Sequence, residues 1–214
     1  MTSRTQEGRP RRRLTADERR TAILDSAMQV FAQSGYHGSS IDEIAQAAGI
    51  SKALIYEHFP SKKDLHASLL DTHMQDLFGR LAANAATDEP GEVRLRAGLE
   101  AFFSWVEDHH GAFRMIFRDA VDPEVADALR GVVDQVTVAV TALIATEPIA
   151  DVGRNENREL AIRMLAQQLT GATQALALWW SDNPDVPRKM LVEMTMDFAW
   201  VGLERLRDGE RYKP

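Results

Sequence analysis

Apolar residues recur every three or four positions through most of this chain, and that spacing predicts α-helices along nearly its whole length. The first helix begins after Thr15 and ends at Gly35, about 20 residues later, because glycine readily takes the left-handed conformation that terminates a helix. No stretch shows a convincing strand pattern. The predicted fold class is therefore all-α. The apolar side of the first helix consists of Ile23, Leu24, Ala27, Met28, Val30 and Phe31.

Several helix starts are marked by a hydroxyl residue that caps the backbone and an acid three residues later that caps back. These pairs predict helices from 40 to 47 and from 61 into the mid-80s, and Ser51 alone starts a helix that ends near 58. The capping pairs are Thr15 with Glu18, Ser40 with Glu43, and Ser61 with Asp64. Later apolar periodicity predicts helices over 92–108, 110–119, 123–147, 156–181 and 186–207.

The two short helices over 40–47 and 51–58 flank the turn Ala48-Gly49-Ile50, the pattern of a helix-turn-helix. In that arrangement the second helix enters the major groove, about 12 Å wide, while the first braces it across the backbone. Helical spacing places Lys52, Ala53 and Tyr56 on one side of the second helix and Ile55 on the other. The outward side is small, flat and partly basic, as a groove-reading surface requires.

The predicted DNA contacts follow from the chemistry of each side chain. Lys52 can donate to a guanine edge or a phosphate, and Tyr56 can offer its hydroxyl to a phosphate and its ring to a thymine methyl. Ala53 permits close approach, and Leu54 adds an apolar contact. The helix starts at Ser40 and Ser51 attract phosphate oxygens, joined by Lys62 and Lys63. Taken singly, each of these residues is better explained as capping or solvating a small helical bundle, but together and in this order they favour DNA binding.

The order of motifs resembles the DNA-binding domain of the TetR family of transcription regulators over about residues 18 to 65. The resemblance implies an all-helical regulator with an N-terminal three-helix head, a C-terminal ligand and dimer domain, and a partly palindromic operator read by two heads. It also implies DNA contacts at Ser40, Lys52, Ala53, Tyr56, His58 and Lys62. Ala53 and Leu54 depart from the residues that the family often has there, which leaves the operator sequence open. The motifs are Gly35-Tyr36, Ser40 to Ala45, Ala48 to Ser51, and Ile55 to Leu65.

Charge is distributed unevenly along the 214 residues. The net charge is −7, yet residues 1–63 hold 10 Lys and Arg against 7 Asp and Glu, and the remainder holds 15 against 25. A basic end for phosphates and an acidic body fit a DNA-binding protein, and chance is the alternative explanation. Arg11, Arg12 and Arg13 belong to an arm that either follows the DNA backbone or minor groove or is a solvated tail. We thus predict a flexible basic arm over 1–13, a helix-turn-helix domain over 14–65, and a ligand-binding and dimerisation domain over 66–214.

Composition excludes several classes of chemistry. The absence of cysteine removes disulfides, thiolate nucleophiles and thiolate metal sites. No apolar run reaches the length of a membrane span, so a cytoplasmic protein without membrane contact is expected. No cofactor or metal site is expected either.

The last two helices are predicted to form a homodimer, because a single head cannot read a palindrome. Small and apolar residues recur there at three- and four-residue steps, which would let two subunits build a four-helix interface. The predicted interface residues are Leu160, Met164, Gly171, Ala175, Leu178, Met190, Met194, Phe198 and Val201.

A high density of large apolar residues between head and dimer helices suggests a cavity for a small apolar effector. For each residue the alternative is an ordinary place in the hydrophobic core. The predicted lining, with Trp180 among the residues that close it, is Leu99, Phe102, Phe103, Val106, Phe113, Phe117, Leu129, Val133, Val136, Leu169, Thr173 and Leu176.

The stretches 101–107, 111–117 and 123–126 are similar to actinobacterial fatty-acid-synthesis regulators within the same family. That resemblance implies a long-chain acyl-CoA effector whose chain threads an apolar channel and changes DNA affinity. Related regulators take other ligands, so an unrelated apolar metabolite or drug stays open.

Two other classes of protein compete with this interpretation. An enzyme would find its best candidate site in Glu107-Asp108-His109-His110, but adjacent helical residues point about 100° apart, whereas paired histidine ligands on a helix need i, i+4 spacing. No Gly-rich phosphate loop or serine elbow occurs, and we expect no enzymatic activity. The other class is a helical interaction module that never touches DNA.

Overall fold

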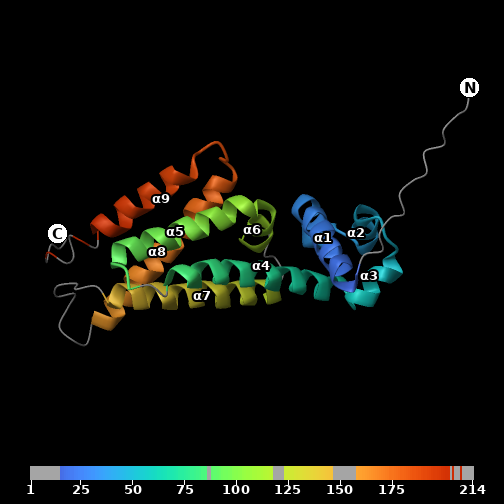
Figure 1. The fold of residues 1–214 in the computed structure, drawn as a ribbon, viewed down its shortest axis with the longest axis horizontal. Coiled ribbons are helices and arrows are strands. Elements are labelled where there is room, and N and C mark those ends of the chain that lie inside the picture. Colours follow the sequence, from blue (N-terminus) through green and yellow to red (C-terminus); the bar gives the residue numbers. More distant parts are fainter. Residues whose placement is uncertain are drawn as a thin grey trace, which may run out of the picture. The chain divides into compact units, whose positions relative to one another are not determined.

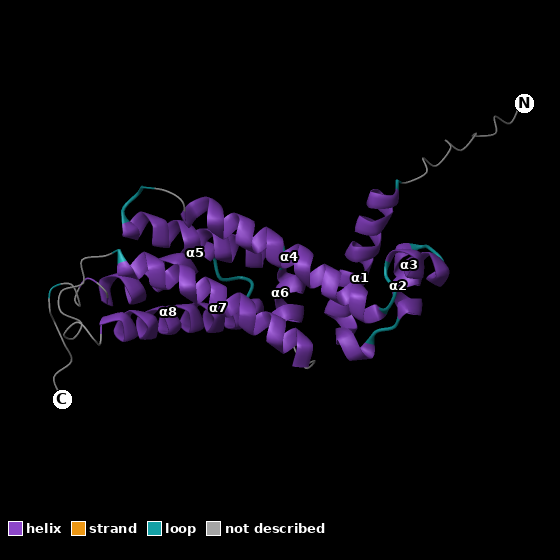
Figure 2. Ribbon diagram, turned by 90° about the horizontal axis from the view of Figure 1, so that it is seen from below, coloured by secondary structure: helices purple, strands orange, loops and turns teal. Residues whose placement is uncertain are grey.

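The computed structural model describes residues 15–85, 88–117, 123–146, 158–202, 204 and 208, without the side chains of 84, 85, 123–129 and 132. The predicted contacts of Arg11, Arg12, Arg13 and the Leu129 side chain therefore lie outside the described part. The described chain is helical with no strand in it, which confirms the all-α fold class (Figure 2). It divides into two compact units, Met1–His66 and Ala67–Pro214.

The first unit contains α1 (Ala16–Gly38), α2 (Ile41–Ala48), α3 (Lys52–His58) and the start of α4 (Lys62–Ala85) (Figure 1). Thr15 and Glu18 form the predicted reciprocal cap at the start of α1. Gly35 has a φ of 70°, so the regular helix ends there as predicted, and the last residues of α1 form a separate turn. The head core consists of fully or almost fully buried Ile23, Ala27, Phe31, Ile44, Ile55, Phe59 and Leu65.

The second unit is built from the rest of α4 and from α5 (Gly91–Asp108), α6 (His110–Phe117), α7 (Pro123–Ala145), α8 (Arg158–Ser181) and α9 (Arg188–Met196). Helices α7 and α8 pack along each other (Figure 2), and α9 packs against α5 (Figure 1). Within the described residues, no helix has both the length and the hydropathy to cross a bilayer.

The C-terminal helix differs from the prediction. A single helix was expected over 186–207, but α9 changes into a π-helical segment, η1, over Asp197–Val201. A π-turn pairs each amide with the carbonyl five residues back instead of four. The sequence there has neither proline nor glycine within the segment to mark the change. Apolar spacing alone therefore could not distinguish it from α-helix.

Candidate nucleic-acid interface and effector cavity

The helix-turn-helix is assembled by local capping contacts. The Ser40 amide donates to Glu43 Oε2 at 2.7 Å, and the Glu43 amide donates to Ser40 Oγ at 3.2 Å, which closes the predicted capping box of α2. Gly49 ends α2 in the left-handed conformation, with a φ of 64° that other residues adopt at a cost. Ser51 Oγ accepts the Leu54 amide at 3.2 Å and starts α3. These contacts fix the turn that separates the two short helices.

The two sides of α3 are as different as the sequence predicts. Ile55 is fully buried, whereas Lys52, Ala53 and Tyr56 are exposed. The exposed fraction of Tyr56 is 45%. Leu54 and His58 are half-buried at the margins of this surface. The geometry leaves an outward side that a DNA groove can contact without disturbing the head core.

Lys52 has a partner within the head. Its Nζ lies 2.8 Å from Asp42 Oδ2, and the hydrogen bond with that carboxylate raises the pKa of the Lys52 ammonium above its ordinary value. Both side chains are largely exposed, so water and salt screen the pair and a phosphate oxygen can replace the carboxylate. The Lys52 ammonium is thus held on the outward side of α3 by an ion pair with Asp42 that a DNA phosphate can replace.

Lys62 has a structural contact that the sequence did not predict. Its Nζ donates to the carbonyls of Tyr36 at 2.7 Å and Ser39 at 2.9 Å, and it lies 4.4 Å from the centre of the Tyr36 ring. An ammonium has three N–H donors, so two of them are committed to tying the start of α4 to the end of α1. The neighbouring Lys63 is exposed.

The second unit contains a cavity of about 400 Å³ that is partly open to solvent, within the usual range for small-molecule sites. Its wall is predominantly apolar and comes from α4, α5, α7 and α8, with Phe117 from α6. Predicted residues found in the wall are Leu99, Phe102, Phe117, Val133, Val136, Leu169 and Thr173. Residues that the sequence analysis missed are Leu77, Leu81, Arg94, Leu95, Gly98, Ala139, Val140, Ala142, Leu143, Thr146, Thr170 and Gln174.

Four predicted lining residues do not belong to this wall, and the prediction is corrected there. Phe103, Val106 and Phe113 are fully buried among other side chains, and Leu176 is half-buried outside the wall. Phe103 contacts Trp180 edge to face, with ring centres 6.0 Å apart, so the core already occupies that direction. Trp180, predicted to close the cavity, is likewise absent from the wall.

Known families match both units. The model of bacterial regulatory proteins of the tetR family matches residues 23–69, and that of the tetracyclin repressor-like C-terminal domain matches residues 91–202. The chain belongs to the TetR family. The first unit therefore carries the DNA-binding domain of a TetR-family transcriptional regulator and the second carries its ligand-binding domain.

Individual regulators of the TetR family are similar to this chain over nearly its whole length. It is 35% identical to the transcriptional activator FasR of Mycolicibacterium smegmatis over 91% of this chain and 87% of FasR, and 28% identical to the regulator EthR of Mycobacterium tuberculosis over 91% and 90%. These relatives are transcriptional regulators rather than enzymes. The resemblance to the TetR family and to its actinobacterial fatty-acid-synthesis regulators is confirmed.

Solved structures of TetR-family regulators share the fold. A TetR-like regulator from Rhodococcus sp. RHA1 superposes with a TM-score of 0.77 at 24% identity, covering 90% of this chain and 99% of that one. FadR of Bacillus subtilis, solved in complex with stearoyl-CoA, gives a TM-score of 0.66 at 20% identity, covering 89% and 99%. At these identities the likeness establishes a shared fold and no more.

Most of the residues predicted for a dimer interface are exposed on this TetR-family domain. Leu160 is 57% exposed and Phe198 66% exposed. Gly171 and Ala175 are exposed and Leu178 is half-buried. Trp179, half exposed, was missed by the sequence analysis. The remaining exposed members of the predicted set are Met164, Met190, Met194 and Val201.

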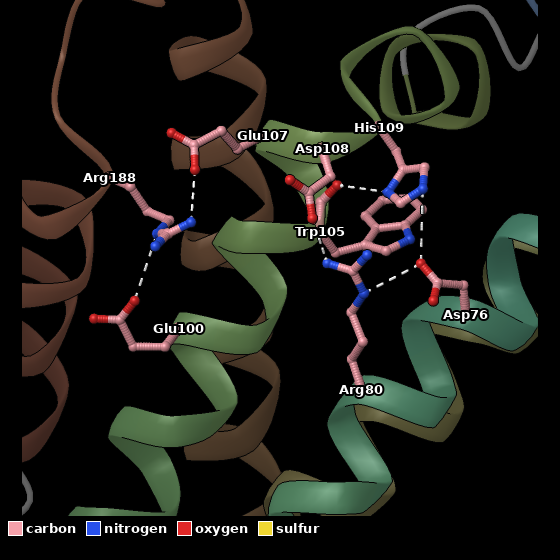
Figure 3. Close-up of polar contacts among 8 residues, drawn as sticks. All are labelled: Asp76, Arg80, Glu100, Trp105, Glu107, Asp108, His109 and Arg188. Atoms are coloured by element: carbon pink, nitrogen blue, oxygen red, sulfur yellow. Dashed lines mark hydrogen bonds and ion pairs between the residues drawn. The ribbon is translucent and has the colours of Figure 1, made fainter.

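A polar cluster connects α4 with the end of α5 (Figure 3). Arg80 contacts Asp108 at 2.7 Å through Nη1 and Asp76 at 3.2 Å through Nε, while His109 Nε2 lies 3.7 Å from Asp76. The Arg80 hydrogen bond holds the pKa of the Asp108 carboxyl below its ordinary value. The His109 ring also stacks on Trp105, with ring centres 5.5 Å apart. The cluster joins α4, which contributes to the cavity wall, to the α5–α6 corner.

The acidic and histidine side chains of 107–110, considered as an enzyme site in the sequence analysis, have partners on several helices. Glu107 accepts from Arg188 at 2.6 Å, Asp108 pairs with Arg80, and His110 Nε2 lies 3.0 Å from the Ser181 carbonyl (Figure 3 shows the first two). Glu107 thus contacts α9, Asp108 and His109 contact α4, and His110 contacts the end of α8. In the part of the chain that the structure describes, no group of three or more His, Asp or Glu side chains is arranged to hold a metal ion.

Proposed function

We propose that this TetR-family chain is a ligand-responsive regulator that binds a pseudo-palindromic DNA operator as a homodimer, with a long-chain acyl-CoA as its effector. The observation that carries the DNA-binding part is the surface of α3, where Lys52, Ala53 and Tyr56 face outward and Ile55 is fully buried. Ser40, Ser51, Lys62 and Lys63 are proposed to contact phosphates, Leu54 to add an apolar contact, and His58 to be a further DNA contact.

The test of DNA binding is the double variant Lys52→Ala/Tyr56→Ala, with Lys189→Ala in α9 as a control for the loss of an exposed charge. Operator fragments selected from genomic DNA by the wild-type chain serve as the probe. The double variant should bind at least about tenfold more weakly with a reduced salt slope, because base and phosphate contacts both disappear. Unchanged affinity with unchanged helix content would favour an interaction module that does not read DNA.

The homodimer is supported by the exposed apolar residues of α8, α9 and η1. At Gly171, a Cβ atom would meet nothing within 4 Å, so a larger side chain fits the single subunit but would block close approach of a second one. Gly171→Leu should therefore shift the chain to monomer in sedimentation and weaken DNA binding. The matched control is Gly131→Leu on α7, which is equally unobstructed. A dimer that persists in Gly171→Leu would place the interface elsewhere.

The effector proposal is supported by the apolar wall of the cavity, by the 35% sequence identity to FasR, and by the fold shared with FadR in complex with stearoyl-CoA. Helix α4 begins with Lys62 at the head and supplies Leu77 and Leu81 to the cavity wall, so a ligand that displaces α4 can alter the head. A coupling free energy of about 1–3 kcal/mol changes DNA affinity about 5- to 150-fold.

The effector test is a thermal shift and DNA-binding titration with acyl-CoAs of about 16 to 20 carbons, whose long apolar chains suit a predominantly apolar wall. Stabilisation at micromolar ligand together with a change in operator affinity supports the proposal. A chain that responds to none of them but does respond to another apolar molecule would reassign the effector while leaving the DNA-binding part intact.

A further inference from the structure

The wall of the cavity contains a cation, Arg94, with a buried N–H donor that has no acceptor among the described residues. Among the described residues that line it, Arg94 alone carries a formal charge. Its Nη2 donates to Thr146 Oγ1 at 2.9 Å, and the Thr146 hydroxyl donates onward to the Leu143 carbonyl at 2.7 Å. Arg94 Nε is buried and meets no acceptor in the described part of the chain. Of the five N–H donors of this guanidinium, one thus serves Thr146, and the buried one at Nε, beside apolar side chains, has no acceptor among the described residues.

A buried donor without an acceptor at Arg94 Nε costs free energy in the folded chain. A buried donor without an acceptor loses its hydration without replacement, and the cost is higher when the group is charged. The described residues form no ion pair with Arg94, so no carboxylate there neutralises it. An anionic group entering the cavity would supply both the missing acceptors and the missing charge.

The position of Arg94 gives the cavity a direction. Arg94 lies in the first turn of α5, and Thr146 directly follows the end of α7, at the same end of the second unit (Figure 1). The wall then follows α5 through Leu95, Gly98 and Leu99 to Phe102, roughly 12 Å at 1.5 Å per residue. The cavity therefore has a cationic end and a long apolar continuation.

We propose that Arg94, oriented by Thr146, binds the negatively charged head group of the effector, whose apolar chain extends along α5 toward Phe102. The site selects single-chain anionic amphiphiles over neutral ones of the same chain length. This assignment rests on the proposed function of the cavity as the effector site. The anionic group is either a carboxylate at the end of a fatty chain or a phosphate of an acyl-CoA.

The test measures affinities for hexadecanoate, hexadecanoyl-CoA and neutral hexadecan-1-ol, by competition with a fluorescent apolar dye at submicromolar lipid. The variants are Arg94→Met, which keeps the length of the side chain, and Arg94→Lys, which keeps its charge. Arg96→Met, exposed on the same helix and outside the wall, is the matched control. Circular dichroism and melting curves verify that each variant folds.

Arg94→Met should weaken an anionic ligand about ten- to one-hundredfold, the range of a hydrogen-bonded charge, and leave hexadecan-1-ol within about threefold of wild type. Arg94→Lys should recover part of the loss, and Arg96→Met should change nothing. A loss confined to hexadecanoate identifies the carboxylate as the head group, and one confined to hexadecanoyl-CoA identifies the phosphates. Equal effects on charged and neutral ligands, or none, would overturn the assignment while the cavity still binds lipid. If the wild type binds none of the three, the acyl effector itself is refuted.

Discussion

The head and the second unit of this TetR-family chain use helices in opposite ways. In the head, the helices close on a core that includes Phe31, Ile44 and Ile55, and function is proposed for the outside, around α3. In the second unit, longer helices leave a cavity of about 400 Å³ between them, and function is proposed for the inside. A surface reader needs a rigid filled core, whereas a sensor needs a packing defect that a ligand can fill.

The largest expected effect comes from emptying the head core. Phe31→Ala removes a fully buried ring and should lower the free energy of unfolding by about 3–5 kcal/mol. Operator binding should be lost, while the affinity for a C16 acyl-CoA should change little if the two regions act as separate structural units. Chemical denaturation, operator binding and lipid competition measure the three quantities. Equal loss of lipid binding would show that the sensor depends on an intact head.

The contrast between the two regions also explains what the sequence could predict. The head is specified by neighbours in the chain: Ser40 with Glu43, Gly35 and Gly49 at helix ends, and Ile55 opposite Lys52. Each of these features depends on a few consecutive residues, so spacing alone was sufficient. Lys62 was the exception, because its carbonyl partners Tyr36 and Ser39 lie far back in the sequence.

The cavity could be predicted only in part, because a buried apolar residue has the same sequence pattern whether it faces another side chain or empty space. Phe103 and Phe113 followed the same periodicity as Leu99 but fill the core instead. Leu77 and Leu81 were missed because the wall they complete is formed by helices distant in sequence. Arg94 was missed because an arginine near a helix start ordinarily indicates a solvated position.

A second prediction concerns a variant that fills the cavity of the second unit with a side chain, so that its interior is packed as the head core is. Gly98 lies in the wall, and a Cβ there would meet nothing within 4 Å, so Gly98→Phe can place its ring in the empty space. The variant should melt at a higher temperature, since apolar surface becomes buried and the helix loses a glycine. Its affinity for a C16 acyl-CoA should fall at least about tenfold, because the ring occupies the volume that the chain needs.

The control for the filled cavity is Gly79→Phe on α4, where the added Cβ is also unobstructed but the residue is exposed and outside the wall. It should keep wild-type lipid affinity. If Gly98→Phe retained full lipid affinity, the effector would bind elsewhere and the cavity would be an unfilled part of the core.

The smallest expected effect distinguishes two exposed ion pairs, one in each region. Asp42 holds Lys52 at the reading surface of the head, and Asp108 holds Arg80 between α4 and α5 in the second unit. Asp42→Asn removes a negative charge that competes with DNA phosphates for Lys52, so operator affinity should rise about three- to tenfold at low salt and less as salt screens the charge. Asp108→Asn removes the same charge from the chain but none from the reading surface, so operator affinity without ligand should stay within about twofold of wild type.

Titration of both variants across ionic strength separates local competition from net charge: equal gains would mean that only the overall charge matters. A loss of affinity in Asp42→Asn would instead show that the carboxylate orients Lys52 for the groove, and the pair would then be part of the reading surface.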